Sequence, residues 1–236
     1  MGAERFSGKS SNAKSHISAT AREYFEGEAY VARTPGDPRH LNPVFPEDAK
    51  VICVGCGGGW EGEANGTSRF VGVDVDEEAR AFRLERNPDD EFYLASGEKL
   101  PFNNGEFTFY MARVCIMYMD MQKAFHEAYR VLATDGYIWF TCHNFDHEWT
   151  HLRRSLRSLL LKDVLYRTYV ILNGSLYHFF GLLIRFPLKR SRIESFQTKA
   201  GMLRGLRLAG FSDVQVQEKG HGLFLVTARK RAAPGE

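Results

Sequence analysis

The sequence contains little that would indicate an oxidised, secreted or nucleic-acid-binding protein. It has four cysteines in 236 residues, which is too few for a disulfide framework, and we expect them to be thiols in or beside core strands. The formal net charge is only +2, which does not by itself indicate a nucleic-acid partner. No apolar signal core opens the chain, so the expected location is a reducing cytoplasm.

A long hydrophobic run is also missing. The longest apolar stretch, residues 168–184, has 17 residues without Asp, Glu, Lys or Arg, and a membrane span needs about 20. It belongs to a larger segment, 147–192, that is rich in arginine and lysine. We consider two interpretations of this segment. It forms a helical cap over the active site, or it is a peripheral element that contacts a membrane surface or a lipid-linked substrate.

The most informative feature is an apolar run, Val51–Val54, that ends in a glycine-rich turn containing Gly55, Gly57 and Gly59. An apolar run of this kind is typical of a buried parallel strand, and glycines at its end let the backbone approach a ligand closely. A second apolar run ends at Asp74, where a carboxylate can accept hydrogen bonds from ribose hydroxyls. The sequence therefore predicts a ligand that contains adenosine.

The glycine spacing argues against a dinucleotide. The G-x-G-x-x-G pattern would need glycine at position 60, where the chain has Trp60. The strand followed by G-C-G-x-G instead resembles the class I S-adenosylmethionine-dependent methyltransferases, in their small-molecule branch. Residues 94–102, 104–107 and 127–136 are similar to later motifs of that family, in the same order.

The resemblance implies an α/β fold, a Rossmann-like doubly wound sheet of about seven strands with an antiparallel C-terminal hairpin and a helical insertion after the fifth strand. We expect a flexible N-terminus over residues 1–18 and a single domain over 19–236. Residues 60–66 predict a short or distorted element. Strands are expected near 51–54, 70–73, 92–95, 107–112, 137–142, 213–218 and 222–228, and helices near 19–30, 76–86, 121–132 and 198–209.

S-adenosyl-L-methionine is the cofactor that the resemblance implies. Ser96 stands where many members of the family carry an acid that meets the adenine, and Glu98 either takes that role or faces solvent. Cys53, Ser96 and Thr108 each replace an acidic residue that is common in the family. The expected cofactor-binding residues are Gly55, Cys56, Gly57, Gly59, Asp74, Val75, Ser96, Gly97, Glu98 and Arg113.

His143 follows the fifth predicted strand, where ligands bind in an open α/β sheet. It is either a general base that takes a proton from a hydroxyl acceptor or a residue that caps the strand end. The helix near 19–30 either covers the cofactor as a lid or packs its aromatic side chains on the sheet edge. The expected acceptor pocket is formed by Tyr24, Tyr30, His147, His151 and Tyr177.

Two patterns suggest metal binding, but we expect no metal. Residues 147–151 match H-E-x-x-H, which on a helix can hold zinc, yet the match opens an insertion and lacks a third ligand at a typical position. Cys53 and Cys56 have C-x-x-C spacing without a second pair. Cys56 also occupies the position of the cysteine in the G-C-G motif.

These observations predict methyl transfer to a small-molecule or lipid- or sugar-like acceptor, at oxygen. Two alternatives remain. The basic insertion would suit a nucleic-acid methyltransferase, although Met111-Ala112-Arg113-Val114 stands where amino-methylating members often carry an N/D-P-P-Y/F motif, so a nucleic-acid partner is not expected. The other alternative is a catalytically silent binding protein that uses the fold as a scaffold.

Overall fold

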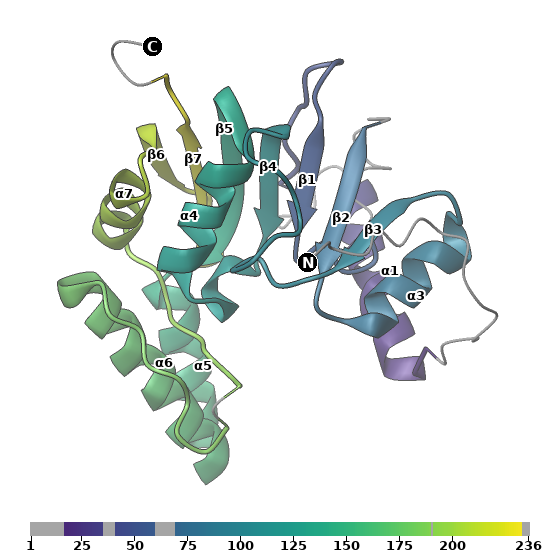
Figure 1. The fold of residues 1–236 in the computed structure, drawn as a ribbon. Helices are drawn as coiled ribbons and strands as arrows, with labels where there is room; N and C mark the ends of the chain where they lie inside the picture. The colour runs from purple at the N-terminus through teal and green to yellow at the C-terminus, as the bar shows by residue number, and fades with distance from the viewer. Residues whose placement is uncertain (1–16, 35–40, 60–68, 190, 233–236) are drawn as a thin grey trace.

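A seven-stranded sheet organises the molecule, with the strand order β3-β2-β1-β4-β5-β7-β6 (Figure 1). The structure is a computed structural model that describes residues 17–34, 41–59, 69–189 and 191–232. The first five strands run parallel, and β7 is antiparallel to both of its neighbours. The predicted doubly wound sheet with an antiparallel C-terminal hairpin is therefore confirmed. The distorted element predicted at 60–66 and most of the flexible segment predicted at 1–18 lie outside the described residues.

Six of the strands begin and end within one residue of their predicted bounds. The exception is β5, which begins five positions before the predicted start at residue 137. The turn-like sequence Thr134-Asp135-Gly136 is an irregularity inside the strand, where the register with β4 shifts and Asp135 has a φ of 61°. The strands are β1 (Val51–Val54), β2 (Phe70–Asp74), β3 (Glu91–Leu94), β4 (Phe107–Arg113), β5 (Leu132–His143), β6 (Ser212–Glu218) and β7 (Leu223–Arg229).

The helices begin at side chains that suit a helix N-terminus. Ser18, Asp76, Asp120, Asn144 and Thr198 each accept a hydrogen bond from a backbone N–H of the following turn. Ser18 thus belongs to the first helix rather than to a flexible segment. The helices are α1 (Ala19–Arg33), α3 (Glu77–Arg86), a 3-10 turn η1 (Ile116–Tyr118), α4 (Met121–Val131), α5 (Phe145–Arg157), α6 (Leu161–Phe180) and α7 (Lys199–Leu208).

Alternate strand residues face two separate cores. Ile52 and Val54 pack into the larger core with side chains of α4, α6 and α7. Val51 and Cys53 face the other way, into a smaller core with Phe25 of α1 and Phe82 of α3. Both faces of the sheet are therefore covered by helices, as a parallel sheet requires.

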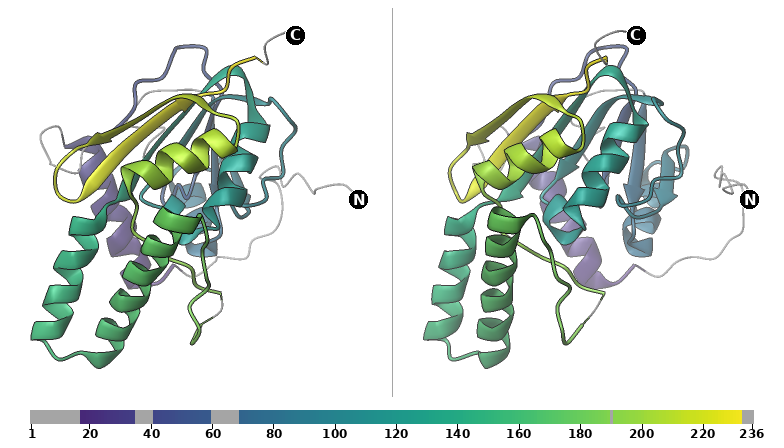
Figure 2. Two further views of the ribbon diagram at one scale, coloured as in Figure 1. Left: turned by 90° about the vertical axis from the view of Figure 1, so that its left-hand side faces the viewer. Right: turned by 60° about the vertical axis from the view of Figure 1, so that its left-hand side comes forward.

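The predicted insertion is a helical hairpin, α5–α6, that projects away from the sheet beyond the carboxyl ends of the strands (Figures 1 and 2). It leaves the sheet at Asn144 and returns at Gln197. The two positions form an isolated parallel bridge, and Gln197 N donates to His143 O at 2.9 Å. In the part of the chain that the structure describes, no helix has the length and apolarity needed to cross a bilayer.

Candidate functional site

The glycine-rich turn after β1 has three left-handed glycines, Gly55, Gly57 and Gly59, with φ values of 65°, 52° and 74°. A Cβ at Gly55 would lie 2.5 Å from the Cys115 side chain, and one at Gly59 would lie 2.7 Å from Arg83. These two glycines are required by internal packing. At Gly57 the nearest atom is a Phe25 ring carbon at 3.7 Å, so this glycine has the most open surroundings.

Asp74 ends β2 beside this turn. Its carboxylate accepts hydrogen bonds from three backbone groups, Gly57 N at 2.9 Å, Val75 N at 2.7 Å and Asp76 N at 3.2 Å. Desolvation by burial is the largest effect on its pKa and raises it, while these hydrogen bonds act in the opposite direction. A carboxylate has about four acceptor positions. One therefore remains for a ribose hydroxyl, and the group fits the cofactor that the resemblance implies.

Further residues expected to bind the cofactor lie directly after β2 and in the turn after β3. Val75 is 72% exposed and offers an apolar surface next to Asp74. Ser96 Oγ accepts from Glu98 N at 3.2 Å, and Glu98 Oε1 accepts from Asp120 N at 2.8 Å. A Cβ at Gly97 would approach Val54 to 2.7 Å. Gly97 is thus a packing requirement, and the Glu98 carboxylate already holds the start of α4.

Helix α1 lies over the glycine turn. Phe25 is 3% exposed and packs against Phe82 with the ring centroids 5.2 Å apart. Glu28 forms an ion pair with Arg113, at the end of β4, at 3.2 Å. A small cavity of about 40 Å³ lies between the helix and the turn. It is lined by Tyr24, Phe25, Glu28, Gly55, Cys56, Gly57, Gly58 and Arg113.

A much larger cavity, of about 660 Å³, adjoins this one at the carboxyl ends of β4 and β5. Tyr24, Glu28 and Arg113 line both cavities. His143 and His147 lie on the wall of the larger one, together with Thr141. A molecule bound in the larger cavity would therefore lie next to whatever occupies the space over the glycine turn.

Three histidines form a column that leads from the end of β5 along α5. The His143 and His147 rings stack with centroids 3.5 Å apart and an interplanar angle of 10°, and His151 lies 4.5 Å beyond His147. Burial, together with the neighbouring imidazoles and Arg167, lowers the pKa of His143 to about 3 and that of His147 to about 4. Both imidazoles are neutral at physiological pH, and both can accept a hydrogen bond.

A buried ionic cluster, formed by Glu148, Arg167 and Glu194, lies beside the histidine column. Glu148, 2% exposed, accepts from Arg167 Nη1 at 2.9 Å, and the same nitrogen lies 3.5 Å from Glu194 Oε1. Tyr166 donates a hydrogen bond to Glu194. The hairpin is thereby joined to the returning segment by paired charges rather than by apolar packing alone.

Ligand atoms of His143, His147 and Glu148 lie within 4.8 Å of one another, and among the described residues this is the group that could hold a metal ion. Two features oppose it. Nearly parallel stacked rings direct their in-plane lone pairs side by side rather than toward one point, and the Glu148 carboxylate is already neutralised by Arg167. His151, the second histidine of the H-E-x-x-H match, is not in the group. The absence of a metal stays a prediction.

The structure brings some of the predicted acceptor residues together and separates others. Tyr24 and His147 line the larger cavity. Three assignments need correction. His151 lines a different cavity on the hairpin, Tyr30 points into solvent at 64% exposure, and Tyr177 is buried in the larger core against α7. The 3.6-residue periodicity of a helix does not determine which face meets a pocket, and this is why Tyr177 was misplaced.

Four polar or charged residues of the larger cavity were not predicted: Glu28, Tyr118, Thr141 and His221. They come from α1, η1, the end of β5 and the loop before β7. Their sequence neighbourhoods carry no motif. Only Thr141 gave a usable signal, because it lies two residues before His143 and alternate strand residues share a face.

Comparisons with known proteins agree with this geometry. Residues 52–140 match the family model of a methyltransferase domain. No curated protein matches the chain significantly. Many solved structures do share the fold.

Three of these structures are representative. A protein from Haloferax volcanii, solved in complex with the Trm112 methyltransferase activator, has a TM-score of 0.62 at 15% identity, over 91% of this chain and 97% of its own. An S-adenosylmethionine-dependent methyltransferase from Thermotoga maritima, a possible histamine N-methyltransferase, has a TM-score of 0.56 at 16% identity, over 89% and 98%. One from Methanosarcina mazei has a TM-score of 0.54 at 19% identity, over 82% and 100%.

At these identities the structural similarity shows the fold alone. The methyltransferase family model adds the region that contains β1, the glycine turn, Asp74 and β4. The arrangement of that region around one free position on the Asp74 carboxylate fits S-adenosylmethionine as the cofactor. Residues 52–140 therefore match a methyltransferase domain, and the chain has the fold of S-adenosylmethionine-dependent methyltransferases.

Proposed function

We propose that this enzyme methylates an oxygen atom of a small-molecule or lipid- or sugar-like acceptor that binds in the larger cavity. The observation that carries the proposal is the junction of the two cavities, because Tyr24, Glu28 and Arg113 line both. Bound S-adenosylmethionine supplies a methyl group activated by a sulfonium. The protein has to hold donor and acceptor in line, and proximity and orientation can contribute about 7–11 kcal/mol to lowering such a barrier.

The chain divides this task between its two cavities. Asp74 would hold the ribose, with its carboxylate fixed by three backbone N–H groups. Gly57 would let the turn pass beside the methionine end. Arg113, paired with Glu28, stands at the junction and would orient the acceptor. Ser96 and Glu98 remain our candidates for the adenine side, and Val75 and Gly97 remain candidates for other cofactor contacts.

His143 is the proposed general base. Its imidazole is neutral and lies on the wall of the larger cavity, so it can accept the proton that a hydroxyl loses as its oxygen takes the methyl group. With its lowered pKa it is a weak base toward a free hydroxyl, but that hydroxyl becomes strongly acidic as its oxygen takes the methyl group, so the imidazole can take up the proton in that step. The cytoplasmic location is also a proposal, supported by four cysteines that are all free thiols.

Calorimetry with S-adenosylmethionine and its demethylated product tests the cofactor part. Asp74→Asn should weaken binding at least tenfold, because a charge-assisted hydrogen bond to the ribose is lost. The matched control is Asp213→Asn, which alters an exposed carboxylate paired with Arg231, and it should bind normally. Equal affinities for the two variants would contradict the assignment of Asp74.

The acceptor part needs a separate experiment. The enzyme is incubated with a metabolite extract and cofactor labelled in its methyl group, and labelled products are identified by mass spectrometry. A methylated hydroxyl or carboxyl group supports the proposal. A labelled amine would instead indicate that the acceptor atom is nitrogen. RNA labelling with a steep dependence on salt would indicate the nucleic-acid alternative instead.

A further inference from the structure

The far end of the α5–α6 hairpin exposes an unusual amount of apolar surface. Leu159, Leu161 and Leu188 are 81%, 80% and 75% exposed. We call this surface the leucine tip. Its residues, all at least half exposed, are Leu156, Leu159, Leu160, Leu161, Leu165 and Leu188. Contiguous apolar surface on a soluble protein marks a site of interaction with another apolar surface.

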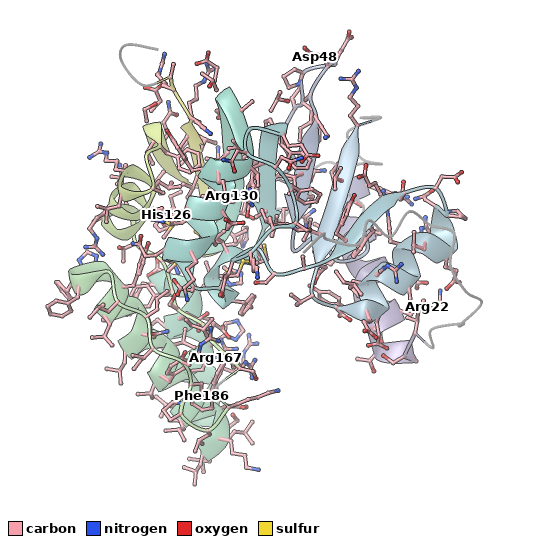
Figure 3. All side chains as sticks on the ribbon, in the orientation of Figure 1. Arg22, Asp48, His126, Arg130, Arg167 and Phe186 are labelled. Carbon is pink, nitrogen blue, oxygen red and sulfur yellow. The ribbon has the colours of Figure 1, made fainter. Side chains whose placement is uncertain are left out.

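The polar interactions that hold the hairpin near the sheet lie outside the leucine tip. The hairpin is held near the sheet by the Glu148–Arg167–Glu194 cluster, and by Asn173, whose amide donates to Glu194 O at 2.9 Å. In Figure 3 the labelled side chains Arg167, of α6, and Phe186, of the segment after α6, lie below the sheet. Leu159 has a φ of 54°, which is an unfavourable backbone conformation for a leucine. The chain therefore keeps a bulky apolar side chain at a turn where glycine would be relaxed.

Cations surround the tip. A cavity of about 550 Å³ lies between α5, α6 and the segment after α6, and Arg154, Lys162 and Arg192 line it together with Ser158. Asp163 is the one acidic residue of its lining. Within the described ranges, no acidic side chain forms an ion pair with Arg154 or Lys162. The cavity therefore suits an anionic group such as a phosphate.

We propose that the α5–α6 hairpin docks on an anionic phospholipid bilayer. The leucines of the tip enter the interface, and the cations of the hairpin cavity bind lipid phosphates. Charge complementarity favours an anionic bilayer over a second copy of the chain or a nucleic acid. A symmetric dimer through the tip would place the two sets of cations against each other, and a nucleic acid would leave the leucines in water.

Flotation with lipid vesicles tests the proposal without any substrate or cofactor, so its result is independent of the proposed acceptor. The protein should float with vesicles of phosphatidylcholine mixed with phosphatidylglycerol, much less with phosphatidylcholine alone, and less at high salt. Leu159→Ser with Leu161→Ser should weaken partitioning by about tenfold per leucine. Arg154→Gln with Lys162→Gln should weaken it by about fivefold per cation.

The control is Leu208→Ser, since Leu208 is 64% exposed on α7, away from the hairpin. This variant should float like the unmodified protein. The proposal is overturned if the protein floats with neither kind of vesicle, or if it floats equally with both at all salt concentrations. It also fails if Leu208→Ser reduces flotation as much as the substitutions in the leucine tip do. It is also overturned if light scattering shows a dimer that the tip variant disrupts and flotation is unaffected.

Discussion

At the scale of single residues, similar sequence signals have different physical causes. Gly55 and Gly59 are needed because Cys115 and Arg83 occupy the space where their side chains would lie, whereas Gly57 is open toward the cavity. The motif alone predicted all three as ligand-binding residues. Sequence shows where a backbone must be glycine, but the neighbour that requires it comes from a distant part of the chain.

The role of His143 can be measured at this scale. His143→Gln should lower kcat by about tenfold to a hundredfold, because glutamine can hydrogen bond to a hydroxyl but does not take up its proton. Since the pKa of His143 is lowered to about 3, the rate of the unmodified enzyme should show no loss from protonation of this group between pH 5 and pH 8.

Two measurements separate catalysis from folding for this residue. Affinity for the cofactor and the thermal midpoint should be unchanged in His143→Gln. His126→Gln, on the exposed side of α4, is the matched control and should keep the full rate. If His143→Gln methylates as fast as the unmodified enzyme, His143 only caps the end of β5.

At the scale of elements, the C-terminal end of helix α6 packs on α7 rather than lining the pocket. Tyr177 of α6 packs over Gly205 of α7, where a Cβ would contact both the Tyr177 hydroxyl and the Phe125 ring. Gly205→Ala should therefore lower the free energy of unfolding by about 1–3 kcal/mol, the usual cost of overpacking a core. Urea denaturation measures the change.

Gly27→Ala is the matched comparison, because Gly27 is also in a helix interior but has nothing within 4 Å of the added carbon. It should raise the free energy of unfolding by up to about 1 kcal/mol through helix propensity. If both substitutions have the same sign, the packing of α6 on α7 differs from that described.

The elements themselves were largely predictable. Short, mostly apolar runs located five strands closely, whereas β6 alternates apolar and polar residues. The predicted starts of three helices fall within one residue of the capping residues Asp76, Asp120 and Thr198. The early start of β5 was not predictable, because Asp135 and Gly136 have the composition of a turn. The faces of α5 and α6 were also not predictable, since both helices are fixed by contacts with residues near 194.

At the scale of the whole molecule, the histidine column makes folding sensitive to acid. Burial lowers the pKa of His143 and His147 below the unfolded value of about 6.5. The unfolded chain then binds more protons, so the contribution is fully present above pH 6.5 and is lost as the pH falls toward 4 and 3. The thermal midpoint should therefore fall between pH 7.5 and pH 5.

His147→Gln tests the origin of this acid sensitivity, because it removes one buried imidazole from the stack. The difference in thermal midpoint between the two pH values should become smaller in this variant. His126→Gln should leave that difference as it is. If the unmodified protein is equally stable at both pH values, the folded state does not lower the pKa of these histidines and the assigned direction is wrong.

The hairpin leaves and rejoins the sheet at Asn144 and Gln197, which pair with each other, and Gln197 donates to the carbonyl of His143. Some fifty intervening residues are thus inserted at one point without altering the order of the strands. Both ends of the insert are thus anchored at one place on the sheet, and among the described residues only His147 of the hairpin reaches the wall of the larger cavity. A shortened hairpin would therefore lose the leucine tip while the glycine turn and Asp74 keep their positions.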